Sequence, residues 1–188
     1  MRGAAFVMNK NCKNILITGL PGIGKTTLVK QLSDQTRHLH PVGFYSEEIR
    51  QEGRRKGFQL VNLDGRISML AHVLIKSSYQ VGKYKVDIKG FDEFIDSMAY
   101  QNWSEKLVII DEIGKMECMS GRFRKMVFEL LDSDNIMIAT ISHTDGGIKG
   151  EIKKREDVTI FHLNLDNRDL MCGEILQIIR ENIQPQLL

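Results

Sequence analysis

The sequence predicts an α/β fold, in which a mostly parallel β-sheet is flanked by helices and carries an antiparallel insertion. Short apolar runs typical of buried strands alternate along the chain with stretches whose apolar residues recur every three or four positions. Segment 42–71 departs from this pattern, because strand-like alternation there is interrupted by turn signals. At roughly 150 residues per domain, the 188 residues predict a single domain over 1–188, with a leader at 1–13.

The first expected elements are a buried strand and a helix on either side of a glycine-rich segment. Residues 14–18 (Asn-Ile-Leu-Ile-Thr) form a short apolar run that ends where the glycines begin. Leu28 and Leu32 lie four positions apart, on one face of a helix expected over 25–35. The glycine-rich segment therefore connects a strand directly to a helix.

Segment 42–71 is expected to form an antiparallel meander inserted after the first helix. Its strands are separated by Gln51-Glu52-Gly53 and by Asp64-Gly65, which are typical turn sequences. The expected strands cover 43–46, 57–61 and 67–70.

The second half of the chain alternates amphipathic helices with apolar strands. Phe91, Phe94, Ile95 and Met98 recur at helical spacing and share one face. Strands that alternate with helices are expected to pair in parallel, with helices on both faces of the sheet. The expected helices cover 91–100, 123–131 and 169–182, and the expected strands cover 107–110, 136–141 and 158–163.

Composition excludes several classes of protein. Apolar residues make up 42% and charged residues 27% of the chain, as in ordinary globular domains, which argues against a disordered or fibrous chain. The net charge of +2 gives no reason to expect nucleic acid or an anionic membrane as a partner. No apolar run approaches the ~20 residues of a membrane helix. The three cysteines are far apart and form no C-x-x-C pair, so we expect a reduced, cytoplasmic location.

A phosphate-binding motif lies between the first strand and the first helix. Its glycines allow backbone N–H groups to turn inward without a clashing Cβ, and the following helix adds its positive end. Lys25 is expected to reach the β- and γ-phosphates, Thr26 to bind Mg²⁺ through its hydroxyl, and Thr27 to contact the α-phosphate. The alternative is a glycine-rich turn with no ligand. The pattern G-x-x-x-x-G-K-[ST] is matched by Gly19, Leu20, Pro21, Gly22, Ile23, Gly24, Lys25 and Thr26.

An acidic pair follows the apolar run 107–110. Asp111 and Glu112 are expected at the carboxyl end of a buried strand, the edge at which open α/β sheets bind ligands. Asp111 would hold Mg²⁺, and Glu112 would polarise an attacking water. The alternative is that both residues only cap the strand end. Together with the phosphate loop, the pair indicates an ATPase-like arrangement, in which another strand lies between the two strands that carry these motifs.

Three further residues are candidates for contacts with the nucleotide. Asn167 could hydrogen-bond the base and Arg168 could stack on it, although Asn167 is equally suited to begin a helix. His143 follows the strand 136–141, where a polar group could sense the γ-phosphate; alternatively it only satisfies loop backbone.

Arginines decide whether hydrolysis is fast, because a positioned guanidinium accelerates it by roughly 10³–10⁵-fold. The candidates are Arg54 and Arg55 in the first turn of the meander and Arg155 before the strand 158–163. Each could instead belong to a solvated basic turn.

Several blocks together resemble the thermophilic-type nucleoside-triphosphatases, the family that includes the vertebrate cancer-related nucleoside-triphosphatase. The resemblance extends from about Asn14 to Glu181, whereas segments 75–89 and 142–147 do not match the family's pattern. The matching blocks are Ile15 to Thr27, Gly43 to Arg50, Gly53 to Phe58, Asp111 to Glu117, and Asn167 to Asp169.

The resemblance implies a RecA-like sheet and slow, Mg²⁺-dependent hydrolysis of ATP, GTP and other nucleoside triphosphates to the diphosphate and phosphate. It assigns phosphate and metal binding to Lys25 and Thr26, the magnesium carboxylate to Asp111 and the base to Glu112. We expect a monomer or a weak homo-oligomer. Three alternatives remain open: a small-molecule kinase with an acceptor pocket near Glu47, Glu48 and Arg50, a switch driven by nucleotide, and an ATPase stimulated by nucleic acid.

Overall fold

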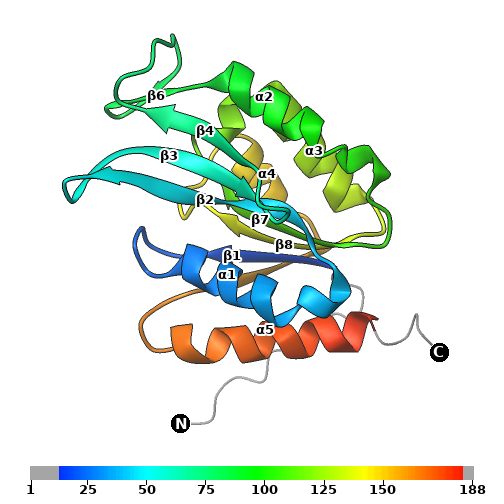
Figure 1. The fold of residues 1–188 in the computed structure, drawn as a ribbon. Coiled ribbons are helices and arrows are strands. Elements are labelled where there is room, and N and C mark those ends of the chain that lie inside the picture. Colours follow the sequence, from blue (N-terminus) through cyan, green and yellow to red (C-terminus); the bar gives the residue numbers. More distant parts are fainter. Residues whose placement is uncertain (1–12, 184–188) are drawn as a thin grey trace.

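The computed structural model describes residues 13–183, so the expected leader lies outside the described residues except for Lys13. Figure 1 shows one twisted sheet with helices on both faces: α1 and α5 lie together on one side, and α2 and α3 on the other. The strands are β1 Asn14–Thr18, β2 Val42–Gln51, β3 Arg54–Asn62, β4 Ile67–His72, β5 Gln80–Val81, β6 Tyr84–Val86, β7 Leu107–Ile113, β8 Ile136–Ile141 and β9 Val158–His162. The α-helices are α1 Lys25–Gln35, α2 Ile88–Ser97, α3 Gly121–Asp132, α4 Ile148–Lys153 and α5 Arg168–Ile183.

Five strands form the parallel half of the sheet. In the described part of the chain the strand order is β5-β6-β4-β3-β2-β7-β8-β1-β9. The pairs β2–β7, β7–β8, β8–β1 and β1–β9 are parallel. β8 lies between β1 and β7, which confirms the expected ATPase-like order. The ends of β1, β8 and β7 that carry the sequence motifs therefore meet at one edge of the sheet.

The meander extends the same sheet, so the sheet formed by the described residues combines a parallel half with the expected antiparallel insertion. The antiparallel pairs β2–β3 and β3–β4 confirm the meander expected over 42–71. However, the first residues of β2 also pair in parallel with β7, from Val42 to Phe44. Two short strands that were not expected, β5 and β6, add to the edge at β4.

Each face of the sheet packs against its own helical layer. Alternation along β1 directs Ile15 and Ile17 toward α1 and α5, and Leu16 toward the opposite core. In that opposite core the Phe44 ring lies 5.6 Å from the Phe94 ring, centroid to centroid, in an edge-to-face arrangement. The two cores hold the central strands rigidly between them. No described helix is long and apolar enough to cross a membrane.

Capping side chains make two helices begin earlier in the sequence than apolar spacing predicts. The Asp87 carboxylate accepts a hydrogen bond from the Gly90 amide at 3.0 Å and begins α2 at Ile88. The Ser120 hydroxyl accepts from the Phe123 amide at 3.0 Å and begins α3 at Gly121. The short helix α4 was not expected, whereas the expected bounds of β1, α1 and β8 are confirmed.

The junction between the two halves of the sheet depends on Gly43, and its substitution gives the first prediction. A Cβ at this position would lie 1.9 Å from the Ile109 carbonyl oxygen, and the backbone φ is +125°. We expect Gly43→Ala to lower the free energy of unfolding by about 3 kcal/mol or more, because it adds both a clash and strain. Urea denaturation followed by circular dichroism measures this loss.

Gly53→Ala is the matched control for this measurement. Gly53 also has positive φ, +73°, but a Cβ there would meet nothing within 4 Å. Gly53→Ala should lower the free energy of unfolding by about 1 kcal/mol, through backbone strain alone. Equal losses for the two variants would contradict the role given to Gly43.

Candidate functional site

The loop between β1 and α1 presents unpaired backbone amides to the surface. Gly22 and Gly24 adopt left-handed conformations, with φ of +79° and +111°, which residues with a side chain rarely adopt. The first hydrogen bond of α1 runs from the Leu28 amide to the Gly24 carbonyl at 2.9 Å. The three preceding amides therefore have no partner within the helix. With no acidic residue in its first turn and no side-chain cap, the start of α1 is suited to bind an anion.

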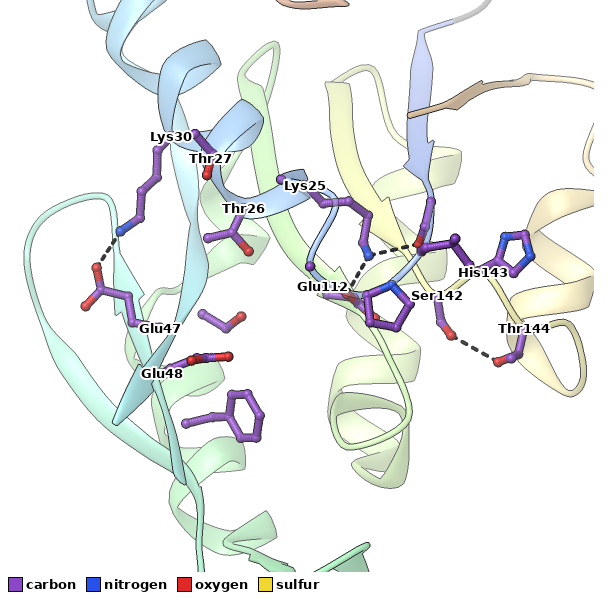
Figure 2. A pocket seen from close by; sticks show the side chains of 17 residues that line it. Lys25, Thr26, Thr27, Lys30, Glu47, Glu48, Glu112, Ser142, His143 and Thr144 are labelled. Atoms are coloured by element: carbon purple, nitrogen blue, oxygen red, sulfur yellow. Dashed lines mark hydrogen bonds and ion pairs between the residues drawn. The ribbon is translucent and has the colours of Figure 1, made fainter. Parts of the chain in front are cut away.

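Lys25 folds back over this loop and reaches β7. Its Nζ donates a hydrogen bond to the Gly19 carbonyl at 3.1 Å and lies 3.8 Å from Glu112 Oε2. The Lys25 side chain is only 10% exposed. Figure 2 shows its ammonium between the loop and Glu112. The cation is thus fixed beside the amides, where phosphate oxygens would meet both.

Asp111 is buried at the end of β7, with 1% of its surface exposed, and both of its oxygens are bonded to hydroxyls. Oδ2 accepts from Thr26 at 2.7 Å, and Oδ1 accepts from Thr140 at 2.5 Å. One carboxylate therefore links α1, β7 and β8. The sequence analysis did not identify Thr140, although a hydroxyl inside the apolar strand β8 is a signal that could have drawn attention to it.

Glu112 reaches the surface of the site next to Asp111, to which it is joined by a cis peptide bond. Its side chain is 32% exposed. Burial raises the pKa of the Glu112 carboxyl above its ordinary value, Asp111 raises it further, and the ammonium of Lys25 partly offsets both. A carboxylate with a raised pKa is a better proton acceptor than an exposed one, which suits the role expected for Glu112.

A third carboxyl group, that of Glu117, is buried next to Asp111 and Glu112, and the sequence analysis gave it no role. Burial raises the pKa of Glu117 to about 8, and the carboxylates of Glu112 and Asp111 contribute. Both its Oε2 and Glu112 Oε1 lie within 3.0 Å of the position that a Cβ on Gly114 would occupy. Gly114 thus leaves room for the two acids to lie close together. Near neutral pH Glu117 is protonated, and the site carries one negative charge fewer than the sequence suggests.

A cavity of about 860 Å³ opens above these groups. One side is formed by the phosphate loop, where every residue from Gly19 to Thr27 except Ile23 contributes. Ile23 instead packs against the core beneath α1. Figure 2 shows Glu112 next to the Lys25 ammonium, Ser142 on one side of this pair, and Glu47 and Glu48 on the other side, beyond Thr26. The remaining lining residues are Lys30, Ser46, Glu47, Glu48, Phe58, Glu112, Ser142, His143 and Thr144.

Thr26 and Asp111 form a donor set that fits Mg²⁺. Magnesium prefers oxygen ligands and is usually held by one or two protein groups, with water and phosphate completing its shell. The hydroxyl and the carboxylate lie 2.7 Å apart at the rim of the phosphate loop. Within residues 13–183, no group of three or more His, Cys, Asp and Glu side chains could hold a metal ion. Thr26 and Asp111 thus offer two oxygen ligands next to the amides that would hold a phosphate.

The structure separates the expected arginines. Arg55 on β3 lies near the cavity but does not line it: it donates to Glu48 at 2.5 Å and to the Tyr84 hydroxyl at 3.0 Å. Arg54 is exposed on the same strand. Arg54 and Arg55 both belong to the β2–β3 hairpin and do not line the cavity. Either the hairpin or the Arg55 side chain would have to move to bring one of these two guanidinium groups to the phosphates.

Arg155 lies at the opposite edge of the sheet, and the structure does not bring it to the site. It pairs with Asp132 at 2.7 Å and with Asp157 at 2.8 Å. Asp157 comes just before β9, whose first residue pairs with the first residue of β1, Asn14. The phosphate loop follows the other end of β1. Because Arg155 precedes β9 in the sequence and β9 runs parallel to β1, it lies at the amino end of the strand, away from the phosphate loop.

Asn167 begins helix α5, the alternative to a contact with the base. Its Oδ1 accepts from the Asn164 amide at 2.9 Å, and its Nδ2 donates to the His162 carbonyl at 2.9 Å. Arg168 is half-exposed, 3.7 Å from Asp169. Neither residue lines the cavity, but their loop adjoins the phosphate loop: the Leu163 carbonyl oxygen lies 2.7 Å from where a Cβ on Gly19 would stand. Contact with a base remains a prediction.

His143 lines the cavity at the end of β8, beside Ser142 and Thr144. Its carbonyl accepts from Lys153 Nζ at 3.2 Å. The Ser142 and Thr144 hydroxyls lie 3.0 Å apart. These groups line the same cavity as Lys25. A sensing role for His143 stays a prediction.

Comparisons with known proteins give a consistent result. A family model described as NTPase matches residues 14–176. The chain is 44% identical to the nucleoside-triphosphatase THEP1 of Thermotoga maritima, over 89% of this chain and 96% of that protein. It is 33% identical to the human cancer-related nucleoside-triphosphatase, over 90% and 98%.

Two solved structures resemble this one over nearly their whole length. The crystal structure of THEP1 from Aquifex aeolicus matches with a TM-score of 0.76 and 34% identity, covering 88% of this chain and 98% of that one. The solution structure of the human cancer-related nucleoside triphosphatase matches with a TM-score of 0.77 and 33% identity, covering 89% and 97%.

Glu117 gives a prediction about stability and pH. The folded chain keeps this proton up to about pH 8, whereas the unfolded chain releases it near the ordinary value of 4.5. Since the folded state binds more protons between these values, the contribution of Glu117 to stability is lost as pH rises from about 5 to 8. The glutamine of Glu117→Gln cannot release a proton, so this variant should lose less stability than the wild type as pH rises. We expect the drop in the free energy of unfolding from pH 5 to pH 8 to be about 2–4 kcal/mol smaller in the variant. Urea denaturation at the two pH values measures this difference, and parallel pH dependences would contradict it.

Proposed function

Since the chain belongs to the nucleoside-triphosphatase family, we propose that its phosphate loop and acidic pair hydrolyse ATP, GTP and other nucleoside triphosphates to the diphosphate and phosphate, with Mg²⁺. The observation that carries this assignment is the 2.7 Å hydrogen bond between Thr26 and Asp111. It joins the phosphate loop to the acidic strand end, two features more than 80 residues apart in the sequence. Together these features suit a ligand that carries both phosphate and a divalent cation.

Binding begins at the loop. The free amides at the start of α1 cradle the β-phosphate, and the Lys25 ammonium bridges the β- and γ-phosphates. The 3.8 Å separation of Lys25 from Glu112 sets the direction of the phosphate chain, because the ammonium points from the loop toward β7. The γ-phosphate therefore lies nearest to Glu112.

Thr26 and Asp111 would hold the magnesium ion, Asp111 through the water shell of the metal. An ion held there would supply positive charge that stabilises the negative charge developing on the phosphates during hydrolysis. Thr140 keeps the Asp111 carboxylate oriented toward Thr26 through its 2.5 Å hydrogen bond. The two hydroxyls thus fix the position of the acid before any ligand arrives.

Glu112 acts on the nucleophile. Its carboxylate orients a water for in-line attack on the γ-phosphorus and takes up the proton. Catalysis then comes mainly from positioning and electrostatic stabilisation. Arg55 is the proposed additional cation, and it would exchange its contact with Glu48 for the γ-phosphate. The nucleotide base lies beside Asn167 and Arg168. The enzyme accepts different bases and turns over slowly.

The setting of the enzyme is part of the same proposal. We propose that residues 1–188 form a single domain that works in the cytoplasm as a monomer or a weak homo-oligomer. The near-neutral net charge of +2 supports a small-molecule substrate rather than nucleic acid.

Lys25→Ala tests the binding role. Loss of the ammonium should abolish phosphate release from ATP with Mg²⁺, because the β- and γ-phosphates lose their bridging cation. Phosphate release is measured with a colorimetric or coupled assay. Lys89→Ala, at an exposed position on α2, is the matched control and should keep wild-type turnover. Wild-type turnover in purified Lys25→Ala would place the activity elsewhere.

Glu112→Gln tests the catalytic role separately from binding. The amide cannot accept the proton, so turnover should fall by at least ~100-fold, in line with general-base effects. Nucleotide should still bind, as measured by isothermal titration calorimetry. The control is Glu93→Gln on the exposed side of α2. Unchanged turnover in Glu112→Gln would remove this residue from the role of base.

A further inference from the structure

The cavity has a wall that the hydrolysis mechanism does not use. Ser46, Glu47 and Glu48 on β2 and Phe58 on β3 line the same space as the phosphate loop. Figure 2 shows Glu47 and Glu48 facing Thr26 from across the cavity, on the side away from Ser142 and His143. In the proposed hydrolysis Glu112 orients the water, and the residues of this wall have no part in that step.

The order of strands places this wall beyond the γ-phosphate. The phosphate loop follows β1, and Lys25 points from it toward Glu112 on β7. β2 is the next strand after β7, and β3 the one after that. A triphosphate whose γ-phosphate lies near β7 therefore has its sugar and base on the side of β1 and β9. A group on β2 stands where an attacking nucleophile would approach, opposite the leaving diphosphate.

Both acids of the wall are held as carboxylates with fixed orientation. Glu47 accepts from Lys30 at 2.5 Å and from Gln59 at 3.1 Å, and the Lys30 hydrogen bond lowers the pKa of Glu47 below its ordinary value. Ser46 lines the cavity with Glu47 and Glu48, and its hydroxyl can donate or accept a hydrogen bond.

Two arginines that do not line the cavity hold Glu48 in the structure, and Arg50 would keep it in place when Arg55 turns to the γ-phosphate. Arg50 donates to it at 2.7 Å and Arg55 at 2.5 Å. Burial opposes ionisation, but these two bonds outweigh it and lower the pKa of Glu48. Carboxylates that are already ionised and oriented accept hydrogen bonds from sugar hydroxyls and repel a second phosphate.

Phe58 adds an aromatic surface to the acidic wall. Its ring lines the cavity and is fixed from behind: the Arg55 guanidinium lies 5.2 Å from the ring centroid, and the Tyr84 ring lies edge-to-face at 5.2 Å. An aromatic ring presented to a cavity is suited to stack on a planar base. Hydroxyl-accepting carboxylates next to a stacking ring match the two parts of a nucleoside.

We propose that this wall is an acceptor subsite for a nucleoside, so that the enzyme also transfers the γ-phosphoryl group from a nucleoside triphosphate to a nucleoside hydroxyl. The proposal rests on the proposed function, because it uses the same phosphate loop, metal site and base. The base of the nucleoside stacks on Phe58, and its sugar hydroxyls bond to Glu48 and Ser46.

The transfer is balanced without any further reactant. The O–H bond of the nucleoside and the bond from the γ-phosphorus to its bridging oxygen break, while a bond forms from the nucleoside oxygen to the γ-phosphorus. The nucleoside diphosphate leaves with the bridging oxygen. Glu112 takes up the hydroxyl proton, as it does from water in hydrolysis. The products are a nucleoside monophosphate and a nucleoside diphosphate.

The experiment uses the full chain with ATP, Mg²⁺ and, in separate reactions, adenosine, guanosine, cytidine, uridine and thymidine. Liquid chromatography with mass spectrometry measures the new nucleoside monophosphate, and a phosphate assay measures hydrolysis in the same samples. We expect at least one nucleoside to yield its monophosphate. We expect Glu48→Gln to lower the ratio of monophosphate formed to phosphate released by about tenfold or more, as for loss of a hydrogen bond to a charged group.

Glu52→Gln is the matched control, because Glu52 lies exposed at the tip of the same hairpin and does not line the cavity. It should leave the ratio unchanged. Phosphate release without any nucleoside monophosphate would overturn the acceptor subsite and leave the proposed function standing. Transfer to nucleoside monophosphates but to no nucleoside would overturn the assigned ligand class. If the ratio of monophosphate to phosphate were equal in Glu48→Gln and the wild type, Glu48 would have no role in the transfer and the acceptor subsite would be overturned. If the chain did not turn over ATP at all, the proposed function itself would be overturned.

Discussion

Burial of the Asp111 carboxylate is the constraint on which the site depends. A charge with 1% of its surface exposed is costly unless its oxygens are bonded, and here two threonine hydroxyls provide those bonds. Because the hydroxyls come from α1 and β8, meeting this requirement draws the phosphate loop, the acidic strand end and the next strand to one point. The same contacts that satisfy the charge therefore assemble the site.

The two halves of the sheet contribute differently to that site. The parallel half fixes the phosphate loop and the acidic pair, because the carboxyl ends of β1, β8 and β7 share one edge and apolar cores hold both faces. The antiparallel half reaches the cavity only through the far part of β2 and through β3. The Glu47 and Glu48 carboxylates on this side are held by ion pairs and hydrogen bonds with other side chains.

The parts of the structure that follow from local patterns could be predicted from the sequence. The bounds of β1, α1 and β8, the meander and the position of the phosphate loop depend on nearest neighbours and on apolar periodicity. The strands β5 and β6 and the helix α4 are too short to show a period. Thr140 and Glu117 gain their importance only from residues distant in sequence, and Arg155 lies at the wrong end of β9 for a reason that only strand direction reveals.

The two contacts of Lys25 have a consequence for timing. Its ammonium is engaged by the Gly19 carbonyl and by Glu112. A triphosphate would offer it several charged oxygens in their place. An arriving triphosphate would draw the cation away and release the carboxylate from its counter-ion at the moment when a substrate is in place. The loop would then couple occupancy to activation through the exchange of a single ion pair.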